Sequence, residues 1–179
     1  MKLKSILPPA IVALVVVFDR IVKLWAVNCL KPLGTMPGIP GIFTFRYTEN
    51  TGAAFSLFQN RRIFLLLAGF LAVIWLVSLL AGIKPLWGKT AIYFTIGGAI
   101  GNMLDRLFYG FVIDMIDISF MNFAIFNIAD CFVSIGTVML IIYMLFFAKD
   151  TEKSKVSEKS DESANAGGTA FSDEDNAND

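Results

Sequence analysis

Residues 63–83 read IFLLLAGFLAVIWLVSLLAGI, a stretch that contains no charged residue and no proline. A helix of about 20 apolar residues is long enough to cross the hydrocarbon core of a bilayer. The stretch therefore predicts a transmembrane helix, and the composition of the whole chain agrees. Of the 179 residues, 56% are hydrophobic, whereas about 45–50% is usual for a soluble domain.

Three further apolar runs of similar length flank this one, at residues 6–28, 90–109 and 128–148. The first resembles a signal peptide, because Lys2 and Lys4 precede its apolar stretch. No A-x-A cleavage motif follows it, and charged residues stand there instead, so we expect an uncleaved span. The sequence predicts an all-α membrane protein with four transmembrane helices.

The basic residues are distributed unevenly between the two sides of the predicted membrane. The side that holds both termini carries Lys2, Lys4, Lys84, Lys89, Lys149, Lys153, Lys155 and Lys159. The opposite side carries Lys31, Arg46, Arg61 and Arg62. Cytoplasmic loops carry the excess of Lys and Arg in membrane proteins, so we expect a multi-pass protein with both termini in the cytoplasm. Residues 30–60 and the loop at 114–126 then face outward.

The outer segment between the first two spans has its own pattern. Residues 31–41, KPLGTMPGIPG, are rich in Pro and Gly and predict turns. Residues 42–50, IFTFRYTEN, place aromatic and polar side chains alternately, which is typical of a strand. The sequence predicts a small β element on the outer face, with its aromatic side in the headgroup layer.

The chain from Asp150 to its end is composed almost wholly of polar and charged residues. Such a segment cannot bury enough apolar surface to offset the entropy of ordering. We expect two parts, a four-span membrane domain at residues 1–149 and a disordered cytoplasmic tail at residues 150–179.

Several classes of site are excluded by residue type. The chain contains no histidine, which removes His-based triads and the H-E-x-x-H metal site. Cys29 and Cys131 lack metal-ligand spacing and are expected to be small apolar fillers rather than a disulfide. No basic patch is interleaved with aromatic residues, so no nucleic-acid partner is expected. No metal and no cofactor is predicted.

Two acidic residues border the apolar runs, Asp114 in GFVIDMIDISF and Asp130 in FNIADCFVSIG. A carboxylate at the bilayer centre costs about 2.5–3.5 kcal/mol on insertion scales, so such acids are usually paired or functional. Two acids at the outer edge can share one proton and one water, which favours an enzyme. By itself, FNIAD also fits a capping box with Asn127 at the helix start. Asp117 is expected in a solvent-facing loop.

The end of the third span, GGAIGNMLDR at residues 97–106, combines close packing with polar groups. Gly97 and Gly101 form a G-x-x-x-G pattern that permits close helix approach. Asn102 and Arg106 lie one turn apart and can orient a peptide carbonyl and a carboxylate together. Asp105 adjoins Arg106, and we expect it in a structural ion pair.

Two further motifs are weaker when taken alone. ENTGAAFS at residues 49–56 is a small, turn-forming segment, and its outward position would allow Asn50 to donate hydrogen bonds to an extended peptide. DRIVK at residues 19–23 spaces Asp19 and Lys23 for an i, i+4 salt bridge. A structural clamp between these two residues is expected.

In this order on four spans, the motifs resemble the signal peptidase II family, the lipoprotein signal peptidases of bacteria. The resemblance covers residues 6–147 and rests on D-x-x-x-K at Asp19, N-T-G-A-A-F at Asn50, G-N-x-x-D-R at Gly101, G-x-V-I-D at Gly110 and F-N-x-A-D at Phe126. Arg20 and Met115 depart mildly from commoner family choices beside the motifs, and neither puts the chemistry in doubt.

The resemblance implies an intramembrane aspartyl endopeptidase in the bacterial cytoplasmic (inner) membrane, with its active site near the outer face. Such an enzyme removes signal peptides from diacylglyceryl-modified prolipoproteins, cleaves before the lipidated cysteine, and is the target of globomycin-type inhibitors. Its partners are therefore lipidated prolipoproteins and membrane lipids. The implied site has catalytic Asp114 and Asp130, substrate-binding Asn50, Asn102, Arg106 and Asn127, and supporting Asp19, Lys23, Gly52 and Asp105.

Two other classes of function remain open from the residues alone. Intramembrane acids also relay protons in small proton-coupled carriers, and a third possibility is a non-catalytic membrane scaffold. A carrier places its polar site near the bilayer midplane, often between broken helices. The two acids here are both expected at one face, which favours the enzyme.

Overall fold

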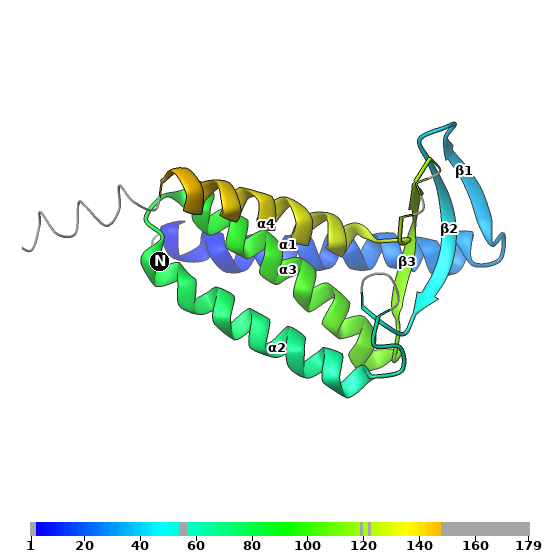
Figure 1. Cartoon of the computed structure of the whole chain (residues 1–179), viewed down its shortest axis with the longest axis horizontal. Helices are drawn as coiled ribbons and strands as arrows, with labels where there is room; N and C mark the ends of the chain where they lie inside the picture. The colour runs from blue at the N-terminus through cyan, green and yellow to red at the C-terminus, as the bar shows by residue number, and fades with distance from the viewer. Residues whose placement is uncertain (1–2, 54–56, 119, 122, 148–179) are drawn as a thin grey trace, which may run out of the picture. The chain divides into compact units, whose positions relative to one another are not determined.

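A computed structural model of the chain describes residues 3–53, 57–118, 120–121 and 123–147. The chain divides into two compact units, residues 1–140 and 141–179, with the boundary inside the last helix. Figure 1 labels the main elements, which are α1 (Leu3–Trp25), β1 (Thr35–Ile39), β2 (Phe43–Asn50), α2 (Arg62–Leu79), α3 (Leu86–Phe108), β3 (Val112–Ile118) and α4 (Ile128–Phe146). A π-helical turn, Ala26–Leu30, follows α1, and a 3-10 turn, Leu80–Gly82, follows α2. The second unit contributes only the last turns of α4 to the described residues.

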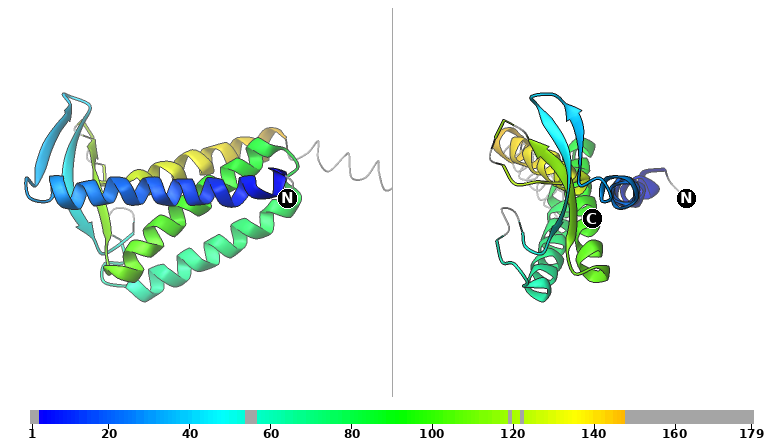
Figure 2. Two further views of the ribbon diagram at one scale, coloured as in Figure 1. Left: turned by 180° about the vertical axis from the view of Figure 1, so that it is seen from behind. Right: turned by 90° about the vertical axis from the view of Figure 1, so that its right-hand side faces the viewer.

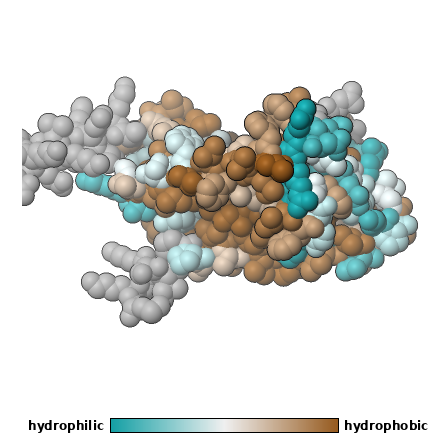
Figure 3. Space-filling model, turned by 90° about the horizontal axis from the view of Figure 1, so that it is seen from below, coloured by the Kyte–Doolittle hydropathy of each residue, from teal (hydrophilic) through white to brown (hydrophobic). Residues whose placement is uncertain are grey.

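The four predicted helices are present, with ends within a few residues of those expected from the sequence. Among the described residues, two helices are long and apolar enough to cross a membrane, Arg62–Gly82 and Ile128–Phe146. Only 6% of the most apolar window of the former is buried, so it presents its apolar side chains outward, unlike the core helix of a soluble protein. α1 and α3 carry both acidic and basic residues in their C-terminal halves, and the prediction of four spans remains a prediction. Figure 3 shows a broad hydrophobic surface over the middle of the helices, with hydrophilic residues toward both ends.

Glycines on α3 allow the other helices to approach its backbone, as the G-x-x-x-G pattern predicts. A Cβ added at Gly97 would lie 2.8 Å from Val15 of α1, and one at Gly101 would lie 2.8 Å from Asp19 Oδ2. A Cβ at Gly98 would meet the carbonyl oxygen of Ala129, which lies in the first turn of α4. α3 thus packs closely against both α1 and the beginning of α4.

The strands form one antiparallel sheet in the order β1-β2-β3, which lies across the helix ends in Figure 2. The register places Thr48 of β2 opposite Asp114 of β3. β2 occupies the predicted strand. Two segments that were predicted as turns or loops form strands β1 and β3 instead. Residues 35–39 form edge strand β1, where Pro37 is tolerated because an edge strand has an unpaired side. β3 forms by antiparallel pairing with β2. Asp117 therefore lies in a strand, with its Oδ2 3.3 Å from Arg46 Nη1.

Two aromatic side chains of β2 pack against protein, and the placement of this face in a headgroup layer remains a prediction. Phe45 and Tyr47 pack against a buried cluster formed by Ala26, Leu30, Ile113 and Met115. The ring of Phe45 lies edge-on to Trp25 with centroids 5.3 Å apart. The aromatic side of β2 therefore fixes the sheet to the end of α1.

The two cysteines behave differently. Cys29 is exposed rather than packed as the predicted filler, whereas Cys131 is half-buried; both are free thiols. The tail predicted at residues 150–179 lies outside the described residues, as do residues 54–56 of the ENTGAAFS segment. The predictions for the tail therefore stay predictions.

Candidate active site

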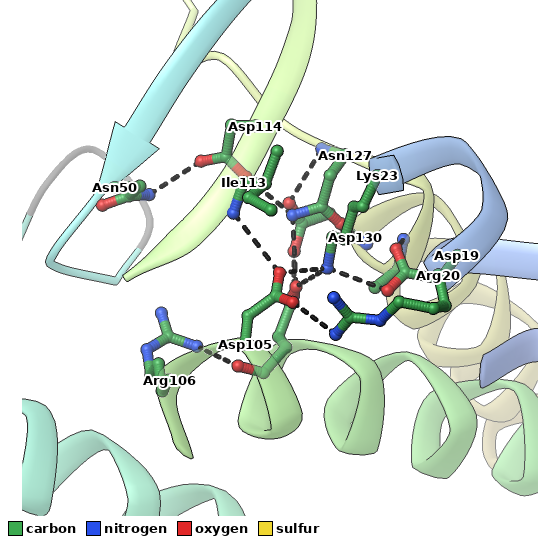
Figure 4. A network of polar contacts seen from close by, with 12 residues as sticks. Asp19, Arg20, Lys23, Asn50, Asp105, Arg106, Ile113, Asp114, Asn127 and Asp130 are labelled. Carbon is green, nitrogen blue, oxygen red and sulfur yellow. Dashed lines mark hydrogen bonds and ion pairs between the residues drawn. The ribbon is translucent and has the colours of Figure 1, made fainter. Parts of the chain in front are cut away.

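The acids that the sequence analysis selected come together because the chain folds back between β3 and α4. Ile116 and Phe126 form an antiparallel bridge, with Ile116 N donating to Phe126 O at 2.8 Å and Phe126 N donating to Ile116 O at 3.1 Å. This bridge returns the chain to β3 just before Asn127. The start of α4, with Asp130 in its first turn, is thereby placed beside Asp114 (Figure 4).

Asp114 is 2% exposed and both of its carboxylate oxygens accept amide hydrogen bonds. Asn127 Nδ2 donates to Oδ1 at 2.6 Å, and Asn50 Nδ2 donates to Oδ2 at 2.9 Å. Burial, with the nearby charge of Asp130, raises the pKa of Asp114 from 3.8 to about 7, although the two amides and the charge of Lys23 oppose the shift. Near neutral pH this acid therefore holds a proton in a large fraction of molecules.

Asp130 lies where a negative charge is favoured. Its Oδ2 accepts a hydrogen bond from Asn127 N at 3.1 Å, and Asp130 N donates to Asn127 Oδ1 at 3.0 Å. This is the reciprocal capping box that the sequence allowed, at the positive end of the α4 dipole. Oδ1 remains to accept from Asn102 Nδ2 at 2.7 Å. The cap and a chemical role are compatible, because Asp130 also lines the cavity described below.

A network of four charges, three of them buried and Arg20 partly exposed, lies behind the acids and joins α1 to α3. The predicted Asp19–Lys23 salt bridge is present at 2.8 Å, and Lys23 Nζ also lies 2.8 Å from Asp105 Oδ2. Arg20 Nη2 lies 2.6 Å from Asp105 Oδ1. Two acids and two bases leave the network neutral, as burial requires.

The structural ion pair expected for Asp105 is present, and its partners lie on α1. Asp105 pairs with Arg20 and Lys23 of α1, not with its neighbour Arg106. Successive helical residues point in different directions, so adjacent charges do not face each other. In the sequence Arg20 is only a departure beside a motif, and no local pattern indicates its place in this network.

Each acid of the network also holds the backbone next to one of the cavity acids. Asp105 Oδ2 accepts a hydrogen bond from Ile113 N at 3.3 Å, one residue before Asp114. Asp19 Oδ1 accepts from Ala129 N at 3.0 Å, one residue before Asp130. The network is thus connected to both segments that carry the acids.

Arg106 reaches the loop that follows β2. Its Nη2 donates to Gly52 O at 2.6 Å and its Nη1 donates to Asn102 O at 3.3 Å. Gly52 N in turn donates to Asn50 Oδ1 at 2.9 Å. Within the described part of the chain, Arg106 Nε is buried and has no hydrogen-bond partner. The guanidinium therefore supports this loop and keeps one donor uncommitted.

A cavity of about 560 Å³ opens over the two acids. Its polar lining consists of Asn50, Asn102, Arg106, Asp114, Asp130 and Ser134. Much of the remaining wall is apolar and comes from residues 123–126 and from the face of α4 that carries Cys131, Val133 and Ile135. Asn127 holds both acids from behind without lining the cavity.

The apolar wall was not predicted as part of the site. The contribution of α4 could have been predicted from the sequence, because Ser134 lies four residues after Asp130 and therefore shares its helix face. For residues 123–126 no short-range pattern indicates the fold-back onto β3. Chemically, two carboxyl groups in one partly apolar cavity, one with a pKa near neutrality, are suited to general acid–base activation of water.

The chain is similar to known proteins over most of its length. A family model described as signal peptidase (SPase) II matches residues 11–146. A lipoprotein signal peptidase of Clostridioides difficile is 41% identical over 138 residues, which are 76% of this chain and 93% of that protein. A lipoprotein signal peptidase of Streptococcus thermophilus is 37% identical over 145 residues, covering 79% of this chain and 93% of that protein.

Two solved structures, each described as a bacterial membrane enzyme, match the fold. Their TM-scores are 0.72 and 0.70, at 32% and 31% sequence identity. The matches cover 82% and 78% of this chain and 90% and 93% of the two solved chains. The residues matched by the family model include the whole cavity lining and the ion network.

Proposed function

This chain belongs to the signal peptidase II family, and we propose that it is an intramembrane aspartyl endopeptidase that removes signal peptides from diacylglyceryl-modified prolipoproteins. The observation that carries the proposal is the placement of Asp114 and Asp130 in one cavity, bridged by Asn127. Two close carboxyl groups cannot both ionise easily, so they share a proton and titrate as a pair.

The surroundings of the two acids suggest which one holds the proton. Asp130 accepts two N–H donors at a helix N-terminus, which favours its carboxylate. Asp114 is the buried acid with the raised pKa. We therefore assign Asp130 as the general base and Asp114 as the general acid of the first step.

In that step Asp130 takes a proton from water as the water oxygen attacks the scissile carbonyl carbon. Asp114 gives its proton to the carbonyl oxygen, and a tetrahedral gem-diol forms. The C–N bond then breaks as Asp130 returns its proton to the leaving nitrogen. Asp114 recovers a proton from the gem-diol hydroxyl, so both acids return to their starting states.

The remaining polar residues divide into two groups. Asn102 and Asn127 orient the acids through the contacts described above. Asn50 and Arg106 line the cavity, and we assign them to the substrate backbone. Cleavage before the lipidated cysteine and inhibition by globomycin-type peptides belong to the same proposal.

The proposal also includes four membrane spans, cytoplasmic termini and a cavity near the outer face. The charges of Asp19, Lys23 and Asp105 are buried and paired inside the bundle, so they do not oppose the insertion of α1 and α3 as lipid-facing charges would. On its outer side α1 exposes Leu14, Val17, Phe18, Ile21 and Leu24. These side chains form an apolar surface suited to lipid.

The test is the product of the reaction. The purified chain, in lipid nanodiscs, should convert a diacylglyceryl prolipoprotein into a signal peptide and a polypeptide whose first residue is the lipidated cysteine, as identified by mass spectrometry. The same precursor without the diacylglyceryl group is the control and should be cleaved far more slowly. Equal cleavage of both precursors, or cleavage at another bond, would remove the assigned substrate.

A further inference from the structure

Lys23 lies at the centre of the network of four charges, yet one of its contacts leaves that network. Lys23 is 0% exposed, and three oxygen atoms lie within 3.0 Å of its ammonium nitrogen. Two belong to Asp19 and Asp105, each at 2.8 Å. The third is the amide oxygen of Asn102, at 3.0 Å, and Asn102 is the residue that contacts Asp130.

The chemistry of this contact determines how the Asn102 amide is oriented. An ammonium group can only donate hydrogen bonds, so Asn102 must present its oxygen to Lys23. Its NH₂ group is then directed to Asp130 Oδ1, 2.7 Å away. In the opposite orientation two donors would face each other at Lys23 and two acceptors would face each other at Asp130. The donors available therefore fix the amide direction.

A second donor reinforces the same orientation. Asn127 Nδ2 donates to Asn102 Oδ1 at 3.1 Å as well as to Asp114 Oδ1 at 2.6 Å. The orientation of Asn127 is itself set by Asp130 N, which donates to Asn127 Oδ1 at 3.0 Å. A continuous set of hydrogen bonds therefore runs from Lys23 through Asn102 to Asp130.

We propose that Lys23 is a positioning residue, which directs the Asn102 amide so that it donates to Asp130 and holds that acid in place as the proposed base. Lys23 lines a different cavity from the catalytic one, so it acts through Asn102. The inference rests on the proposed function and adds to it the reason that a buried lysine lies beside the catalytic acids.

The position of Lys23 has a second, separable consequence, which is electrostatic. The charged groups around Asp114 are Asp130 on α4, Arg106 on α3 and Lys23 on α1. The charge of Lys23 favours the ionised form of Asp114. Removing that charge should move the Asp114 titration to higher pH.

The experiment compares Lys23→Met with the charge-balanced double variant Lys23→Met/Asp19→Asn. Both variants remove the donor to Asn102, but only the first leaves the network with an unbalanced negative charge. We expect kcat to fall about tenfold to a hundredfold in both variants, because one charge-assisted hydrogen bond is lost. KM should change little, since Lys23 does not line the cavity. The alkaline limb of the pH–rate profile should shift upward in the single variant.

Lys31→Met is the matched control, since Lys31 also pairs with an acid, Glu49 at 2.8 Å, but at an exposed site. It should keep the wild-type kcat. A double-mutant cycle with Asn102→Ala adds a decisive readout, because the losses from Lys23→Met and Asn102→Ala should be strongly non-additive. Additive losses in kcat, or an unchanged kcat per folded molecule in both Lys23 variants, would overturn the inference.

A readout that needs no turnover separates this inference from the proposed function. Thermal unfolding of wild type and of Lys23→Met, measured from pH 5 to pH 9, follows the Asp114 titration directly. An upward shift in Lys23→Met supports the electrostatic coupling even if no prolipoprotein is cleaved. An unshifted titration contradicts the coupling even if the wild type is fully active.

Discussion

At the scale of single residues, Asp114 is the group whose chemistry the fold changes most clearly. A carboxyl group on a solvent-facing strand would be ionised at neutral pH, but burial and Asp130 raise the pKa of Asp114 to about 7. The two amides from Asn50 and Asn127 act in the opposite direction, since they stabilise the charged form. The protonation state of the pair is therefore sensitive to pH within the physiological range.

The environment of Asp114 predicts how the reaction rate depends on pH. The proposed mechanism needs one proton on the pair, and that proton is lost as the pH rises through about 7. We expect kcat/KM to fall by about tenfold per pH unit well above this value. A steady-state profile from pH 5 to pH 9 measures it. A rate that is constant or rising up to pH 9 would contradict the assignment of Asp114 as the protonated acid.

The same shift predicts how stability depends on pH. The pKa of Asp114 is raised on folding from 3.8, so the folded state binds the proton more tightly than the unfolded state. Between about pH 4 and pH 7 stability should therefore decrease as the pH rises. Asp114→Asn cannot titrate and should lack this contribution. Melting temperatures of the two proteins across this range are the measurement. If wild type and Asp114→Asn show the same dependence on pH, Asp114 is solvated and the prediction is wrong.

Arg106 tests the importance of a planar donor at the cavity. Its Nη2 holds Gly52 and its Nε has no partner in the described residues. Lysine keeps the charge but loses the fork, so Arg106→Lys should lower kcat/KM about tenfold to a hundredfold. Globomycin should also bind this variant more weakly. Full activity with lysine would reduce Arg106 to a general positive charge, and full activity with alanine would remove it from the site.

At the scale of elements, α3 sets the position of the first turn of α4. Gly98 faces the Ala129 carbonyl, and a Cβ there would also lie 2.8 Å from Val133 Cγ2. Gly98→Ala should push the beginning of α4, and with it Asp130, away from Asn102. We expect a loss of about 1–3 kcal/mol in stability, as for other overpacked sites, together with a fall in kcat.

Gly69→Ala is the matched control for this prediction. A Cβ at Gly69 meets only the flexible side chain of Met103, at 3.0 Å, so it should be accommodated at small cost. Melting temperature and turnover of both variants are the measurements. If Gly98→Ala and Gly69→Ala behave alike, the close approach of α3 to α4 does not position the acid.

The elements also show where sequence reasoning succeeds. Helix positions follow from long apolar runs, and the Asp19–Lys23 bridge follows from its i, i+4 spacing, because both are local properties. The sequence does not reveal strand β3, because its acids interrupt the apolar pattern and its pairing partner β2 lies more than 60 residues earlier. For example, Asn50 of β2 and Asp114 of β3 are 64 residues apart. Arg20 and Asp105 are 85 residues apart, so only the packing of α1 on α3 reveals their pairing.

At the scale of the whole molecule, the proposed function requires one orientation in the membrane. A reporter inserted near Gly38 should be external, and one fused after Asp150 should be cytoplasmic, because the lysines are concentrated on the side of the termini. Thiol labelling or enzymatic reporters in intact cells measure both positions. The reverse pattern would place the acids on the cytoplasmic side, where exported precursors are not processed.

The residues after Asp150 are expected to be dispensable for catalysis. They are polar and have almost no apolar residues to pack, and the proposed topology places them across the membrane from the cavity. A chain that ends at Asp150 should process prolipoprotein at the wild-type rate per molecule. A large loss of turnover at equal abundance would show that the tail takes part in function.

The central claim is that Asp114 and Asp130 form one catalytic pair, and substitution by asparagine tests it most directly. Asp114→Asn and Asp130→Asn keep the side-chain volume but cannot transfer the proton, so each should abolish cleavage of a diacylglyceryl prolipoprotein while the protein remains folded and inserted. Asp117→Asn, on the same strand but paired with Arg46, should retain most activity. The account predicts two inactive variants and one active one. Near-normal cleavage by either Asp114→Asn or Asp130→Asn would contradict it.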